Sequence, residues 1–353
     1  MKRYLIVLAL IIVTFGLGAA IRKHYQGARH IDFAHEPLWA YGYTTPPAPG
    51  DTALPQRPPT RALRVGEDSV EQTRLRSIEG SGARYSLVDI RDGHNVIDWF
   101  PEDHPPMPAV VAHGPAALDR RALGCAYCHL PNGKGRPENA SVAALPVSYF
   151  TRQIRDFRSG KRRSADPRKP NTNTMIALAK ALSDEELIAA VEYFGSLKWT
   201  PRVRVIETDS VPETRIEGNL FLPSSRERTE PIAGRIIEVP EDIEQSELHR
   251  NPRSGFVAYV PRGSIEKGKA LVLTGASVGG HKTTPCGTCH GPELMGLGDA
   301  PPIAGRSPSY IVRQLWDIQQ GTRNGEAAGL MKPVVASLTE QDLVAIAAYV
   351  SSR

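Results

Sequence analysis

Two short stretches decide the fold: CAYCH from Cys125 to His129, and CGTCH from Cys286 to His290. They contain all four cysteines of the 353-residue chain. In a helix, positions i, i+3 and i+4 share one face, so each stretch can present two thiols and an imidazole at one side of a helical turn. Such a turn can bind a metal directly, exchange disulfides or hold a cofactor.

The sequence around the two stretches is an internal repeat. SYFTRQIRDFRSGKR recurs as SYIVRQLWDIQQGTR at the offset of 161 residues that also separates the two CxxCH stretches. MIALAKALSDEELIAAVEYF recurs as MKPVVASLTEQDLVAIAAYV at an offset of 156 residues. Similarity of this kind within one chain indicates two copies of one domain.

Covalent attachment of haem explains both stretches, because CxxCH is the sequence signature of two thioether bonds and a histidine on the iron. A compact zinc module keeps its cysteine pairs closer together. A thioredoxin-like redox pair needs a βαβ context, which neither copy has. We therefore predict two covalently attached haem c groups, with these thioether and proximal iron ligands: Cys125, Cys128, Cys286 and Cys289, with His129 and His290.

Two methionines occupy equivalent places in the copies. Met175 and Met331 lie 46 and 41 residues past the histidines and just before the last helix of each copy. A thioether on the far side of the iron raises its potential and favours electron transfer. Methionine more commonly fills a core, but the match between the copies favours Met175 and Met331 as the distal iron ligands.

Other candidate residues are given structural roles. Met107 is assigned to a loop, and neither copy lacks a methionine, so three nearby histidines are not assigned to iron: His94, His104 and His113. The basic run KRRSADPRK, residues 161–169, could meet haem propionates or an acidic partner, but a solvated loop is the ordinary state of a charge run. The net charge of +5 does not indicate nucleic-acid binding.

The first residues predict export. MKR is followed by eighteen uncharged residues and then by Arg22 and Lys23, which suits a membrane anchor or a signal cleaved after small residues. Basic residues at the start stay in the cytoplasm. We therefore expect the chain on the periplasmic side of a bacterial inner membrane, anchored by this helix, or soluble in the periplasm if the segment is cleaved.

Changes in the pattern divide the chain into five segments. The predicted segments are a signal or anchor (1–23), a proline-rich spacer and N-terminal extension (24–112), the first helical copy (113–200), a small β-rich insert (201–263) and the second copy (264–353). Within them, SVEQTRLRSIE and LDRRALGCAYCH are expected to be helical and ARYSLVDIRDG to form a strand. Four short β-branched runs in the insert, from Arg202 to Pro261, are expected to be strands.

Together the copies resemble class I cytochrome c domains, and the whole chain resembles bacterial membrane-anchored dihaem c-type cytochromes. The resemblance implies a mainly α fold, haem attachment at the four cysteines, and the axial pairs His129/Met175 and His290/Met331. Pro301 follows His290 where such domains place a proline, whereas the first copy has Ala140, so its loop is expected to differ.

The function expected from these features is single-electron transfer between periplasmic or membrane redox partners, such as a dehydrogenase and a terminal oxidase. Filled axial positions leave no open iron site, which favours a carrier over an enzyme. Two alternatives stay open: a dihaem redox enzyme, peroxidase-like or thiosulfate dehydrogenase-like, and the cytochrome subunit of a membrane-bound dehydrogenase or oxidase.

The matched methionines give the first testable prediction. Replacing Met175 or Met331 by Ala should abolish the near-infrared sulfur–iron band of the corresponding haem and lower its potential, because the thioether stabilises the reduced iron. The band is measured by near-infrared spectroscopy on the oxidised protein, with Met107→Ala as the control. Because each variant keeps the band of its other haem, we expect a partial loss of absorbance in each, and a band of undiminished intensity in both variants would contradict the assignment of these two ligands.

Overall fold

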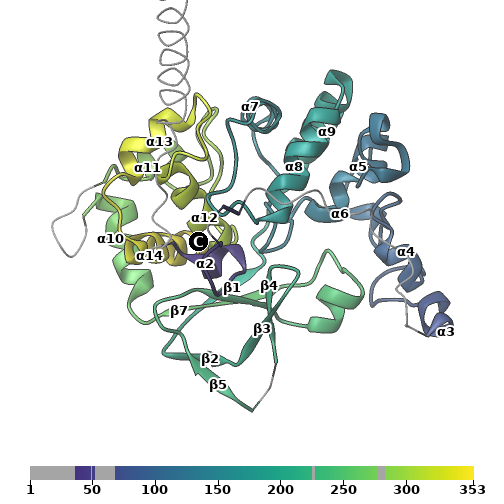
Figure 1. Ribbon diagram of the computed structural model, residues 1–353, viewed down its shortest axis with the longest axis horizontal. Helices are drawn as coiled ribbons and strands as arrows, with labels where there is room; N and C mark the ends of the chain where they lie inside the picture. Colours follow the sequence, from purple (N-terminus) through teal and green to yellow (C-terminus); the bar gives the residue numbers. More distant parts are fainter. Residues whose placement is uncertain (1–35, 49, 52–67, 225–226, 277–282) are drawn as a thin grey trace, which may run out of the picture. The chain divides into compact units, whose positions relative to one another are not determined.

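In chain order, a first group of helices is followed by a run of short strands and then by a second group of helices (Figure 1). The computed structural model describes residues 36–48, 50–51, 68–224, 227–276 and 283–353, and the predicted export segment, residues 1–23, lies outside them. Among the described residues, no single helix is long and apolar enough to cross a membrane. Residues 328–335 and 340–351 have that length and composition only when counted together, and a bend of 117° separates them.

Each copy of the repeat contains a short CxxCH turn followed by three helices. The first copy contains α5 (Ala109–His113), α6 (Cys125–His129), α7 (Val147–Arg158), α8 (Pro170–Ala181) and α9 (Asp184–Ser196). The second copy contains α10 (Ser264–Thr274), α11 (Gly287–His290), α12 (Pro308–Gln319), α13 (Ala328–Val335) and α14 (Glu340–Ser351). The matching order follows from the matching sequence pattern.

The last helix of each copy begins at a capping box. Ser183 accepts a hydrogen bond from the backbone N–H of Glu186, whose carboxylate accepts one from the N–H of Ser183. Thr339 and Asp342 make the same reciprocal pair at the start of α14. Both bonds satisfy donors that a helix start leaves free. A serine and a glutamate three residues apart, as at Ser183 and Glu186, are the sequence signature of such a helix start.

The N-terminal extension contains α2 (Leu38–Tyr41), α3 (Ser69–Thr73), α4 (Leu87–Arg91) and a 3₁₀ turn, η2 (Pro101–Asp103). The helix expected over SVEQTRLRSIE is confirmed only for its first five residues, as α3, and the strand expected in ARYSLVDIRDG is wrong. Ser86 and Asp89 form a capping box that starts α4, and only Tyr85 makes a bridge, to Arg76. Reciprocal capping outweighed the weak β pattern of these residues.

The segment before the first CxxCH stretch is also less helical than expected. Residues 116–121 form a 3₁₀ turn, η3 (Ala116–Arg121), and Asp119 inside it has φ 47°. The α-helix begins only at Cys125. At Gly124 an added Cβ would lie 2.3 Å from the carbonyl oxygen of Ala112. The chain therefore passes too close to α5 for any larger residue, and this close passage sets where α6 starts.

The described residues of the insert form seven short strands, and the four runs expected to be strands are confirmed. They are β1 (Val203–Thr208), β2 (Ser210–Pro212), β3 (Thr214–Glu217), β4 (Leu220–Pro223), β5 (Thr229–Pro231), β6 (Ile237–Pro240) and β7 (Phe256–Pro261). In the largest sheet, β7 lies between a parallel β1 and an antiparallel β6. β2 pairs with β5, and β3 with β4, both antiparallel. The turn η4 (Glu244–Leu248) precedes β7.

The two copies meet through equivalent residues of the repeat. Arg162 of the first copy donates to the Tyr310 hydroxyl (3.0 Å) and to Gln314 Oε1 (2.8 Å) of the second. Arg323, the counterpart of Arg162, donates to the Tyr149 hydroxyl (2.8 Å) and to Gln153 Oε1 (2.9 Å). Each copy therefore offers the same groups to the other, as in a two-fold symmetric dimer.

Helix α2 packs against α12 where the two copies meet. The Tyr41 hydroxyl donates to Asp317 Oδ1 (2.8 Å), and Arg313 donates to the carbonyl of Ala40 (2.5 Å). From the first copy, Lys169 Nζ donates to the carbonyl of Tyr41 (3.1 Å). The segment that precedes the proline-rich spacer therefore joins the two copies through a third set of contacts.

Glu36, at the start of this segment, is a buried carboxyl group. It is 7% exposed, and neither of its carboxyl oxygens has a hydrogen-bond partner. Burial, followed by the nearby Asp166 and Asp317, raises the pKa of Glu36 to about 8, against the opposing effect of Arg168. The folded protein therefore favours the protonated form of Glu36 at neutral pH.

Replacing Glu36 by Gln should raise the free energy of unfolding at high pH. The folded pKa lies above the ordinary value of 4.5, so the wild type loses stability as the pH rises from 4.5 to about 8. Glutamine cannot ionise, so we expect the variant to gain ~3 kcal/mol relative to wild type between pH 5 and pH 8. Denaturant unfolding at both pH values measures this difference.

Glu192→Gln on the exposed face of α9 is the matched control for removing a carboxylate. A gain from Glu36→Gln of equal size at pH 5 and pH 8 would show that Glu36 is already ionised in the folded protein.

Candidate functional site

Helix α6 places two thiols on one helical turn. The Cys125 thiol lies 3.3 Å from the carbonyl oxygen of Val110 in α5, and burial raises the pKa of this thiol to about 12. Cys128 lies one turn further on and is half-buried. None of the four cysteines forms a disulfide. The Cys125 thiol is therefore neutral, and it lies with Cys128 at one wall of a cavity.

His129 is held in one tautomer. Its Nδ1 lies 2.8 Å from the carbonyl oxygen of Ala140, which can only accept, so Nδ1 carries the proton. Burial, and then the charge of Arg162, lower the pKa of His129, although the bond to Ala140 opposes them. The ring is therefore neutral at neutral pH, and its Nε2 lone pair is left to bind a metal ion.

The second copy repeats this arrangement. His290 Nδ1 lies 2.8 Å from the carbonyl oxygen of Pro301, eleven residues further on, which is the spacing between His129 and Ala140. Burial, and then Arg323, lower the pKa of His290. The first loop was expected to differ because it has Ala140 in place of a proline. For this hydrogen bond that expectation is wrong, because the acceptor is a backbone carbonyl that both Ala140 and Pro301 have.

One cavity brings the predicted residues of the first copy together. Cys125, Cys128, His129 and Met175 all line it. Its walls are otherwise largely apolar side chains of the first copy: Leu145, Phe150, Ile154, Phe157, Leu178, Leu182, Leu187, Val191 and Phe194. The Phe194 ring stands edge-on to His129, with ring centroids 6.1 Å apart. Met175 lies in α8 and His129 in α6, so the thioether and the imidazole come from different elements around one apolar space.

The rim of the cavity is polar and comes from both copies. Arg162, Arg163, Lys169 and Asn171 belong to the first copy, and Tyr310, Arg313, Gln314 and Asp317 belong to α12 of the second. The prediction of a solvated loop for residues 161–169 is wrong in part, because Arg162 is 9% and Lys169 is 2% exposed. Contacts with α2 and α12 draw these two cations inward.

The residues of this cavity fit a haem c group. Two thiols one turn apart match two vinyl groups, the imidazole and the thioether supply two axial donors, and the apolar walls match a macrocycle. Cations at the rim suit its carboxylates. A metal held by protein side chains alone fits less well, because no three His, Cys, Asp or Glu residues gather to hold an ion in the described ranges.

The second site is more open in the described structure. Cys286 and His290 are half-buried and Cys289 is exposed, and burial raises the pKa of Cys286 to about 11. Met331 lies half-buried in α13, two residues before Pro333. No described contact joins Met331 to His290, so its ligation stays a prediction.

Sequence reasoning missed the residues that the second copy contributes to the rim of the first site. Tyr310, Gln314 and Asp317 each repeat an identical polar residue of the first copy at an offset of 161 residues. Identical polar residues within an otherwise diverged repeat are the signal that could have indicated a shared interface.

A mainly helical fold with such a cavity defines a c-type cytochrome, a protein that holds haem c through cysteine thioethers. The sequence profile of the cytochrome c family matches residues 265–353. Cytochrome c-554(548) of Halomonas halodenitrificans is 35% identical over 79 residues, 22% of this chain and 95% of that protein. The chain belongs to the cytochrome c family, and it binds haem c covalently and transfers electrons.

Other relatives match more of the chain. A thiosulfate dehydrogenase electron acceptor of Thiomonas intermedia is 26% identical over 241 residues, 67% of this chain and 82% of that protein. In the solved structure of Acidithiobacillus ferrooxidans cytochrome c4, the match covers 65% of this chain and 98% of that one, with 20% identity and a TM-score of 0.42.

The reciprocal contact at the rim gives a stability prediction. Replacing Arg162 by Lys should lower the free energy of unfolding by ~2 kcal/mol, because one ammonium cannot reach Gln153, Tyr310 and Gln314 together. Denaturant unfolding measures the change, and Arg163→Lys, at the exposed neighbouring position, is the control. Equal stability of the two variants would show that the contacts of Arg162 contribute little.

Proposed function

We propose that this chain is a dihaem c-type cytochrome that carries single electrons through two His/Met-ligated haems. The observation that carries the proposal is the convergence of Cys125, Cys128, His129 and Met175 on one apolar cavity. The repeat supports a second site of the same kind, built from Cys286, Cys289, His290 and Met331. When bound, each haem supplies an iron that gains and loses one electron.

The protein side chains then orient and shield each haem. The carbonyls of Ala140 and Pro301 hold His129 and His290 with Nε2 as the free nitrogen. The apolar walls keep water from the first site, which favours the less charged, reduced state. The rim shared by the two copies gives electrons a route between the sites through packed protein.

The relatives suggest where the electrons come from. One of them is named as an electron acceptor of thiosulfate dehydrogenase. We propose by analogy that this chain accepts electrons from a periplasmic oxidoreductase and passes them to a second redox protein, such as a terminal oxidase. The apolar N-terminal run supports export, with the body anchored at the periplasmic face of the inner membrane or released there.

The number of haems tests the proposal. A pyridine haemochrome assay on the purified full chain should give two c-type haems, and the double variants Cys125→Ser/Cys128→Ser and Cys286→Ser/Cys289→Ser should each give one, because haem without thioether bonds is lost on denaturation. The two double variants serve as controls for each other. Fewer than two haems in the wild-type chain would overturn the dihaem assignment.

A further inference from the structure

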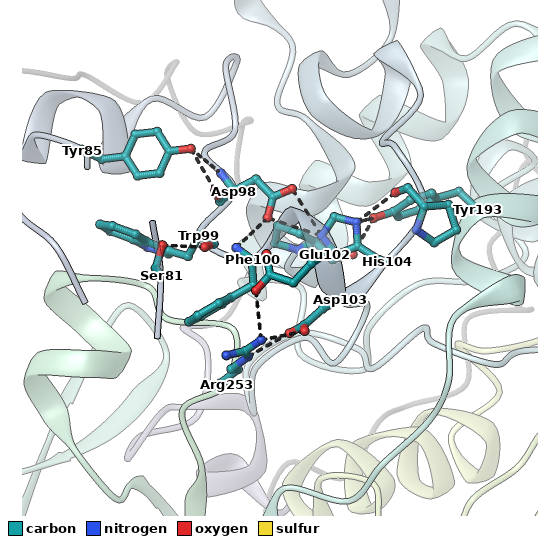
Figure 2. A network of polar contacts seen from close by, with 12 residues as sticks. Ser81, Tyr85, Asp98, Trp99, Phe100, Glu102, Asp103, His104, Tyr193 and Arg253 are labelled. Carbon is teal, nitrogen blue, oxygen red and sulfur yellow. Dashed lines mark hydrogen bonds and ion pairs between the residues drawn. The ribbon is translucent and has the colours of Figure 1, made fainter. Parts of the chain in front are cut away.

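A network of polar contacts lies beside the first CxxCH site, outside the residues that line its cavity. Figure 2 shows it: residues 81–104 of the extension meet Arg253 of the insert and Tyr193 of α9. The Tyr193 hydroxyl donates to the carbonyl of Pro131 (2.7 Å), two residues after His129. A side chain that holds Tyr193 therefore acts on the loop that carries the proximal histidine.

His104 is the side chain that contacts Tyr193. Its Nδ1 lies 2.9 Å from the Tyr193 oxygen and 2.9 Å from the carbonyl oxygen of Pro105. Its Nε2 lies 3.3 Å from the carboxylate of Asp98. The imidazole is 3% exposed, so water cannot replace these partners.

Counting protons fixes the charge of this imidazole. Tyr193 has one hydroxyl proton, and the carbonyl of Pro131 can only accept it, so the tyrosine oxygen must accept from His104. Nδ1 therefore carries a proton, which it shares with the carbonyl of Pro105. Nε2 faces a carboxylate, which also only accepts. Both ring nitrogens thus face acceptors, and His104 is a buried imidazolium.

The charges around His104 agree with this assignment. Burial opposes the charged form, but Asp98, the carbonyl of Pro105 and then Asp103 together raise the pKa of His104. Asp103 is itself paired with Arg253 (2.6 Å), which also contacts Glu102 (3.3 Å). Lys134 is a further cation that acts on Asp103. Asp98 is therefore the partner whose charge His104 balances directly.

We propose that His104 is a positioning residue for the first haem, acting through Tyr193 on the loop after His129, so that the reduction potential of this haem depends on the protonation of His104. The inference rests on the proposed function, because it needs a haem at the first site. A nearby cation favours the reduced state, which carries one positive charge less. When the reduced protein passes an electron to its partner, release of the His104 proton to solvent is therefore favoured.

The second copy is a built-in comparison. Tyr349 of α14 occupies the repeat position of Tyr193. Its ring lies 5.6 Å from the guanidinium of Arg353, and its hydroxyl has no histidine partner in the part of the chain that the structure describes. The potential of the second haem should therefore lack this dependence on pH.

The test is a redox titration of the full-length holoprotein, followed by its visible spectrum, between pH 5 and pH 9. Met331→His assigns the two potentials, because it changes the ligand of the second haem only. In the wild type, the first potential should fall as the pH rises through the pKa of His104. This fall should disappear in His104→Gln and shrink in Tyr193→Phe, whereas Tyr349→Phe should behave as the wild type.

A second measurement reports the protonation of His104 independently of the haem potential. In ¹⁵N-histidine NMR spectra of the same proteins, the signal lost in His104→Gln should show both ring nitrogens protonated at neutral pH in the wild type. A neutral ring, or a first potential with the same pH profile in wild type and His104→Gln, would overturn the inference.

Failure of the proposed function is a separate result. It would show as fewer than two haems per chain in the haemochrome assay, whereas the inference alone fails when two haems are present and the first potential ignores His104. If His104→Gln does not fold, the comparison of Tyr193→Phe with Tyr349→Phe tests the inference instead. Equal pH profiles of the first potential in these two variants would overturn it.

Discussion

Arg162 and Arg323 each bind the copy opposite to their own. The rest of the structure depends on these two sets of contacts. A buried guanidinium destabilises a fold unless its donors are satisfied, and here each arginine reaches a tyrosine and a glutamine of the other copy. The two copies can satisfy these donors only in one relative position. That position places α12 at the rim of the first cavity and leaves the surface to which α2 binds.

The two CxxCH sites share their local chemistry and differ in their surroundings. Each histidine donates through Nδ1 to a carbonyl eleven residues further on, so both are prepared to bind iron through Nε2. The first site is enclosed by α12 and adjoined by the extension and the insert, whereas Cys289 of the second is exposed. Two copies of one domain can therefore differ in potential and in access to a partner without any change of ligands.

Much of the fold could be predicted where the signal was local. Ser183 and Glu186, three residues apart, predicted a helix start because both partners of a capping box lie within one turn. The strands of the insert followed from β-branched runs between turns. The same local logic, applied to Ser86 and Asp89, would have corrected the strand expected there. The inward position of Lys169 could not be predicted, because its partner Tyr41 lies 128 residues away.

By itself, the sequence determined the chemistry of the sites, because thioether attachment and the proximal ligand need only three residues within one helical turn. It also determined that there are two such turns, through the repeat. Only the tertiary structure decided what surrounds them: the carbonyls that orient His129 and His290, the rim that the second copy adds to the first site, and the contact of His104 with Tyr193. These depend on pairs separated by 11 to 152 residues, and packing, which a local pattern does not encode, sets their distances.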